Sequence, residues 1–249
     1  MIKLFRHIRQ RLLIENKMSK YLLYAIGEIV LVVIGILIAL QLNEWNGERK
    51  DQNQEVKILL QLNTDLRANL EEIIEIREIA VQRSAACDSI MAYISDKKPL
   101  DDSLKVYLER LNMDALFNNA NTTYSYIQSQ GTNFLTNDTL RARITGMYER
   151  DFQNIFSRET MAWQIVIDNL RPIYERLLTV GSTMEYDFSP YTENTPKDMA
   201  LFYQDEAFQV VVARMRVQTG VRTTWLATTV NKLDELIVDI DLEILKLSH

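Results

Sequence analysis

The feature that most constrains this chain is an apolar run near the start of its 249 residues. About 22 residues, from Tyr21 to Leu42, contain one charged side chain, that of Glu28. A helix rises about 1.5 Å per residue, so the run covers about 30 Å, the thickness of a bilayer's hydrocarbon core. Its Leu, Ile and Val residues outweigh one acid, which costs about 3 kcal/mol even at the bilayer centre. The run therefore predicts a transmembrane helix.

The same run is longer than the apolar region of a cleaved signal peptide, which has about 7–15 residues before a small-x-small site. Ala39 lacks a suitable small partner for such a site. We therefore favour an uncleaved signal anchor over residues 21–45. Tyr21 and Tyr24 at one end and Trp45 at the other are expected to anchor it at the two membrane interfaces.

Basic residues predict the orientation of this helix. After the run, Arg49 and Lys50 are mixed with acids, whereas the leader, residues 1–20, carries a single acid, Glu15. The positive-inside rule then places the leader in the cytoplasm and residues 46–249 outside it. The leader is either an amphipathic helix lying on the inner leaflet or a basic tail without ordered structure. Its basic residues are Lys3, Arg6, Arg9, Arg11, Lys17 and Lys20.

Glu28 shares one face of the predicted helix with three other residues. At 100° per residue, Glu28, Val32, Gly35 and Ala39 fall within about 60° of one another. Gly35 and Ala39 form a small-x-x-x-small pair, which permits close approach of a second helix. Three roles for Glu28 stay open: an interface anchor, a contact between packed helices, or a group that handles ions or protons.

Residues 46–249 have the pattern of an all-α helical bundle. The chain has only seven Gly and four Pro, so long helices are expected. Alternating steps of three and four residues indicate a first long helix with one apolar face. Its stripe is Leu59, Leu62, Leu66, Asn69, Ile73, Ile76 and Ala80, continuing to about Cys87.

Local signals predict where the later helices begin and end. Pro99 ends the first helix, and Asp101, Asp102 or Ser103 caps the second. Thr122 or Thr123 is expected to cap a short helix that Gly131 terminates in a left-handed conformation. Pro172 is expected to kink a long helix that starts near "TNDTL". Residues 181–197, rich in Pro, Ser and Thr, are expected to form a non-helical loop.

Several functions are disfavoured by composition. The chain has one cysteine, Cys87, and two histidines, His7 and His249. Catalytic and metal sites that depend on several Cys or His residues are therefore disfavoured. Glycine-rich phosphate loops and serine-hydrolase elbows are absent from the sequence. The net charge of -6 argues against nucleic-acid binding. We therefore expect neither an enzyme nor a cofactor-binding or metal-binding protein.

Several short pieces resemble a family of uncharacterised single-pass inner-membrane proteins abundant in Bacteroidota. They are Gly27-Glu28-Ile29, Ile38-Ala39-Leu40-Gln41, Asn43-x-Trp45-Asn46 and "TTYSYIQSQGTNFLTNDTLRARITGMYE". The resemblance implies a bacterial inner-membrane location with a periplasmic C-terminal domain. It implies no activity.

Three functional hypotheses follow. The first is a membrane-anchored scaffold or accessory subunit whose periplasmic bundle binds another copy of itself or a membrane or periplasmic protein. The second is a ligand-sensing bundle, in which Arg141, Arg143, Trp163 or Arg171 would line a site between helices. The third is an oligomeric channel or proton-linked assembly that uses Glu28.

Overall fold

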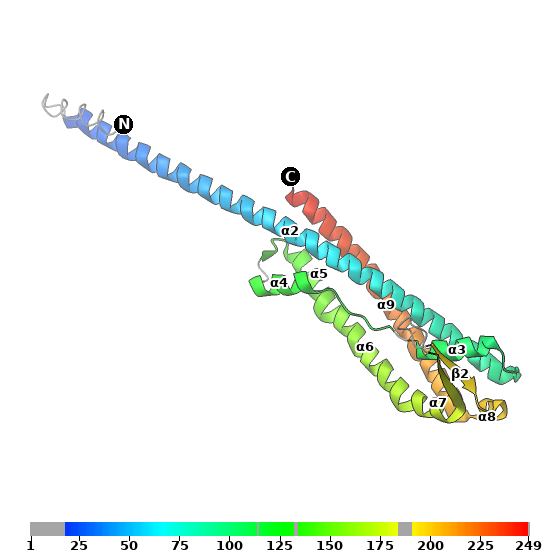
Figure 1. Ribbon diagram of the computed structural model, residues 1–249. Helices are drawn as coiled ribbons and strands as arrows, with labels where there is room; N and C mark the ends of the chain where they lie inside the picture. The colour runs from blue at the N-terminus through cyan, green and yellow to red at the C-terminus, as the bar shows by residue number, and fades with distance from the viewer. Residues whose placement is uncertain (1–17, 114, 132–133, 184–190, 249) are drawn as a thin grey trace. The chain divides into compact units, whose positions relative to one another are not determined.

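The computed structural model describes residues 18–113, 115–131, 134–183 and 191–248 (Figure 1). The chain divides into two compact units, Met1–Val56 and Lys57–His249. The described residues form the following elements: α2 (Met18–Asp96), α3 (Asp102–Asn112), α4 (Thr122–Gln130), α5 (Asp138–Gly146), the π-helical turn η2 (Met147–Asp151), α6 (Phe152–Ile165), the π-helical turn η3 (Val166–Leu170), α7 (Arg171–Leu177), β1 (Leu178–Thr183), β2 (Tyr191–Pro196), α8 (Met199–Gln204) and α9 (Glu206–Leu247). Over the described residues the fold is all-α apart from one β-hairpin.

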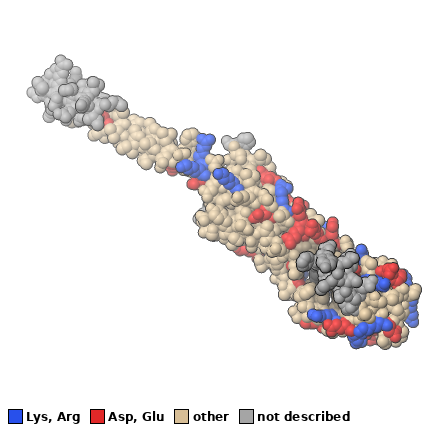
Figure 2. Space-filling view, viewed as in Figure 1, with Lys and Arg blue, Asp and Glu red and all other residues tan. Residues whose placement is uncertain are grey.

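The first unit contains the apolar part of α2. Its most apolar 18-residue window has a mean hydropathy of 2.3, and none of that window is buried against the rest of the protein. Figure 2 shows the stretch as tan surface, with charged residues gathered beyond it. By length and composition this helix could span a membrane. The amphipathic leader was expected at residues 1–20, of which 1–17 lie outside the described residues.

The helix does not break at the polar stretch that follows the apolar run. α2 continues through residues 46–55 to Asp96. The reason is compositional: Glu, Arg, Lys and Gln, which are good helix formers, make up six of these ten residues, and the stretch contains no proline.

The second unit is built on three long helical segments, of which α9 runs antiparallel to both α2 and the α5–α6 segment. The amide of Asn63 on α2 donates to Asp241 on α9 at 2.7 Å, and Arg216 on α9 donates to Asp88 on α2 at 2.8 Å. The part of α2 around Asn63 thus lies against the C-terminal end of α9, as Figure 1 shows. The α5–α6 segment also runs antiparallel to α9, because Asp151 pairs with Lys232 and Glu159 pairs with Arg222.

Two apolar clusters fill the second unit. The predicted stripe on α2 is confirmed as core, since every residue from Leu59 to Cys87 in it is buried. The first cluster joins this stripe to α4, α5, α6 and the C-terminal half of α9. The second joins the end of α2 to α3, α7, β1, α8 and the start of α9. The alternation of three and four residues thus positions all three helices around a common seam.

The helix boundaries agree with most of the local signals. Asp101 caps α3, and its side chain accepts from the backbone N–H of Leu104 at 3.0 Å. Gly131 has φ +91° after α4, in the region expected of glycine, although its ψ of 141° is outside the left-handed helical range. The predicted cap at Thr122 or Thr123 is wrong, because α4 starts at Thr122 and Asn121 precedes it without a side-chain capping bond.

The stretch expected to be a loop is largely a β-hairpin. β1 and β2 pair antiparallel, with Leu178 opposite Pro196 and Thr183 opposite Tyr191. Thr179, Val180, Thr183 and Tyr191 favour strands, and proline falls at the strand end, where it is tolerated. Residues 184–190 lie outside the described residues.

Pro172 coincides with a change of helical geometry. The π-helical turn η3 precedes it, and Pro172 lies in the first turn of α7. A π-helical turn inserts an extra residue, which shifts the hydrogen-bond pattern where proline lacks an N–H. The long helix thus changes its hydrogen-bond pattern at Pro172, and the kink expected there stays a prediction.

Candidate functional site

Three charged side chains occupy positions that the helical pattern assigns to the core. Arg83 lies on the α2 stripe between Ala80 and Cys87, and it is 5% exposed. Glu159 on α6 and Arg222 on α9 are 4% and 9% exposed. Burying charge is costly unless it is paired, so their arrangement is the most specific polar feature of the bundle.

Glu159 is the centre of a buried polar network. Its two oxygens accept the backbone N–H of Phe117 at 3.1 and 3.2 Å. The Nη2 of Arg222 donates to Glu159 at 2.9 Å and to the carbonyl oxygen of Ala115, also at 2.9 Å. The network therefore ties the segment between α3 and α4 to both α6 and α9.

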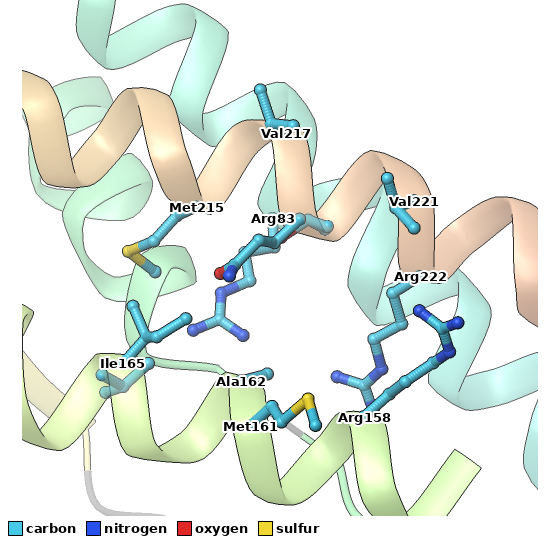
Figure 3. A pocket seen from close by; sticks show the side chains of 12 residues that line it. Arg83, Arg158, Met161, Ala162, Ile165, Met215, Val217, Val221 and Arg222 are labelled. Carbon is cyan, nitrogen blue, oxygen red and sulfur yellow. The ribbon is translucent and has the colours of Figure 1, made fainter. Parts of the chain in front are cut away.

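A pocket of about 190 Å³ opens beside this network, between α6 and α9. Figure 3 shows the guanidinium groups of Arg83 and Arg222 in the space between the two helices, with Arg158 reaching from α6 toward α9. The described residues that line it include no acid. They are Arg83, Arg158, Met161, Ala162, Ile165, Val166, Met215, Val217, Gln218, Thr219, Val221 and Arg222.

Arg158 is held by an aromatic ring at the edge of the pocket. Its guanidinium carbon lies 4.1 Å from the centroid of the Trp225 ring, within the range of a cation–π interaction. Among the described residues, Arg158 takes part in none of the ion pairs, whereas Arg222 is paired with Glu159. A guanidinium stacked on a ring keeps its N–H edge available for a carboxylate.

Two further reactive side chains of the bundle, those of Cys87 and Tyr174, are buried. Burial is the main cause that raises the pKa of the Cys87 thiol to about 11. Burial also raises the pKa of Tyr174, whose hydroxyl donates to the carbonyl of Leu108 at 2.9 Å. Among the described residues, no group of three or more His, Cys, Asp or Glu is placed to hold a metal ion.

The transmembrane residues singled out by sequence lie in the first unit. Val32, Gly35, Ala39 and Trp45 are exposed, and Glu28 is half-buried. A Cβ atom added at Gly35 would meet nothing within 4 Å. The side chains of Tyr21 and Tyr24 lie outside the described residues. The roles of this face and of the interface anchors stay predictions.

The residues proposed from sequence for a ligand site are located elsewhere. Arg141 pairs with Asp138 and Arg171 with Glu175. Arg143 pairs with Asp239, in a surface groove between α5 and α9, and Trp163 is half exposed. None of them lines the pocket. Sequence reasoning overlooked Arg83 and Arg222. The sequence does contain a signal for them, because both interrupt apolar stripes at core positions.

The fold defines a class: an apolar N-terminal helix that could span a membrane, joined in sequence to a helical bundle with a small arginine-lined pocket. A model of a family of unknown function, DUF6090, matches residues 28–167. The chain belongs to this family, in agreement with the resemblance to an uncharacterised family. No curated protein and no solved structure matches the sequence.

Proposed function

We propose that this protein is a single-pass scaffold or accessory subunit of the bacterial inner membrane, with a cytoplasmic leader and a periplasmic helical bundle. The observation that carries the proposal is the apolar part of α2, which has no buried residue in its most apolar window. A core helix of a water-soluble protein would bury one face, because exposing a large apolar surface to water is unfavourable. An exposed apolar helix surface of this kind is favourable in the lipid of a membrane.

The proposed partner within the membrane is a second copy of the chain. Glu28, Val32, Gly35 and Ala39 lie on one face of a regular helix. Gly35 and Ala39 allow two helix backbones to approach closely, since no side chain of the unit itself fills the space at Gly35. An acid near the end of the span is better accommodated against a partner helix or at the lipid headgroups than in the hydrocarbon.

Self-association is tested by native mass spectrometry of the full chain released from nanodiscs. Gly35→Leu and Glu28→Leu are expected to weaken the oligomer while the protein still inserts. Val30→Leu is the matched control, because Val30 lies on the opposite face of the helix. A monomeric parent protein would contradict self-association, and equal oligomer in all variants would show that Glu28 serves only as an interface anchor.

The second candidate function is ligand sensing by the periplasmic bundle. It is favoured by the pocket between α6 and α9, which combines apolar walls with arginine side chains. Sites of this kind, mostly apolar with a few polar groups, are typical of small-molecule binding. Thermal unfolding of the full chain in the presence of small anions tests this candidate, and a ligand that raises the melting temperature supports it.

A further inference from the structure

We propose that the pocket between α6 and α9 binds a small aliphatic carboxylate, with Arg158 as the residue that recognises the carboxylate group. The inference rests on the second candidate function, ligand binding in this pocket, and it requires neither anchoring nor self-association. It rests on the volume of the pocket, on the chemistry of its walls, and on the position of the Arg158 guanidinium over Trp225.

The size of the pocket selects a small ligand. Its volume of about 190 Å³ is below the roughly 300–1,000 Å³ typical of sites for drug-sized molecules. The apolar walls are made mainly by Met161, Ala162 and Ile165 on α6 and Met215 on α9. A short hydrocarbon chain suits these walls.

The charge of the pocket selects an anion. Three arginines and no acid line it among the described residues. Arg83 and Arg222 are buried and engaged within the fold, and the charge of Arg222 is offset by Glu159. Arg158 is half-buried and lies at the edge, so its N–H groups can reach a ligand entering from solvent.

The apolar walls distinguish a carboxylate from a phosphate. A carboxylate needs two hydrogen bonds from one guanidinium edge, which Arg158 can provide while it stays stacked on Trp225. A phosphate dianion is more strongly hydrated and would lose more solvation beside Met161 and Ile165. Gln218 and Thr219 add neutral polar groups, but no further cation.

Isothermal titration calorimetry of the full chain in nanodiscs tests the assignment, with hexanoate as the probe and empty nanodiscs as the blank. Saturable binding of hexanoate is expected, and at least tenfold weaker binding of neutral hexanamide and of inorganic phosphate. Arg158→Met is expected to reduce the affinity for hexanoate at least tenfold, in line with the strength of a charged hydrogen bond. Arg171→Met, which removes an exposed arginine on α7, should leave the affinity unchanged.

A second variant keeps the test valid if Arg158→Met fails to fold. Ala162→Leu keeps Arg158 but adds side-chain volume at a partly exposed lining position, and it should abolish binding without lowering the melting temperature. The assignment is overturned if hexanoate shows no saturable binding, if hexanamide or phosphate binds as tightly, or if Arg158→Met and Ala162→Leu both bind like the parent. Because monomers and oligomers contain the same pocket, these outcomes are independent of the test of self-association.

Discussion

The pair of Arg222 and Glu159 allows the sharpest test of how the bundle is held together. Both side chains are nearly inaccessible, with 10% and 5% of their surfaces exposed, and they are 2.9 Å apart. Arg222→Met keeps much of the packing volume but leaves the Glu159 carboxylate buried without the guanidinium. Breaking a buried ion pair in this way costs about 3–5 kcal/mol. For a domain of this size, that corresponds to a melting temperature lower by roughly 6–20 °C.

The assay is thermal unfolding of the full chain in nanodiscs, followed by circular dichroism. Arg214→Met is the matched control, because Arg214 is exposed on the same helix, and it should change stability by about 0.5 kcal/mol or less. In the double variant Arg222→Met/Glu159→Gln, the Gln carbonyl still accepts the N–H of Phe117 and neither position of the pair carries a charge. The double variant should therefore be more stable than Arg222→Met alone. A cost below about 1 kcal/mol for Arg222→Met, or simple additivity in the double variant, would refute this reasoning.

Three further perturbations test other parts of the structure. Cys87 should resist alkylation by iodoacetamide at pH 8 in the folded protein and react in urea, because burial raises its pKa to about 11; rapid labelling without denaturant would contradict this. Burial raises the pKa of Asp151, but hydrogen bonds from Arg150 and Lys232 outweigh burial and hold the pKa below its ordinary value. The ionised Asp151 therefore stabilises the folded protein above about pH 4, and this stabilisation is lost as the pH falls through the lowered pKa. Lys232→Met should therefore lower the melting temperature by roughly 2–8 °C at pH 7, and a difference from the parent that persists undiminished at lower pH would count against it. Gly131→Ala should cost about 1–3 kcal/mol in thermal unfolding because of the positive φ, whereas Gly220→Ala, inside α9 with open space around it, should be neutral or stabilising.

Periodicity along the chain was sufficient to predict the helical core. The stripe from Leu59 to Cys87 is buried as expected, because steps of three and four residues keep one face of a helix on the seam. The cap of α3 was predicted to be Asp101, Asp102 or Ser103, and Asp101 is the residue that caps it. The hairpin of β1 and β2 was missed, because its strands are short and their polar residues resemble those of a loop.

The pocket was not predicted, because its residues are distant in sequence. Arg83, Arg158 and Arg222 come from three helices, and nothing local indicates that they meet. Arg83 and Arg222 could have been noticed as charges on apolar stripes, which usually mark a buried polar contact. The stacking of Arg158 on Trp225 depends on the register between α6 and α9, which the sequence pattern alone leaves open.

The central claim is that a bilayer separates the leader from the bundle. It is tested most directly in bacterial spheroplasts, with a Cys87→Ser background and single cysteines introduced as Lys3→Cys or Ser248→Cys. A membrane-impermeant maleimide is expected to label Ser248→Cys in intact spheroplasts and Lys3→Cys only after permeabilisation. Labelling of both positions in intact spheroplasts, the reverse pattern, or recovery of the protein in the soluble fraction would contradict the account.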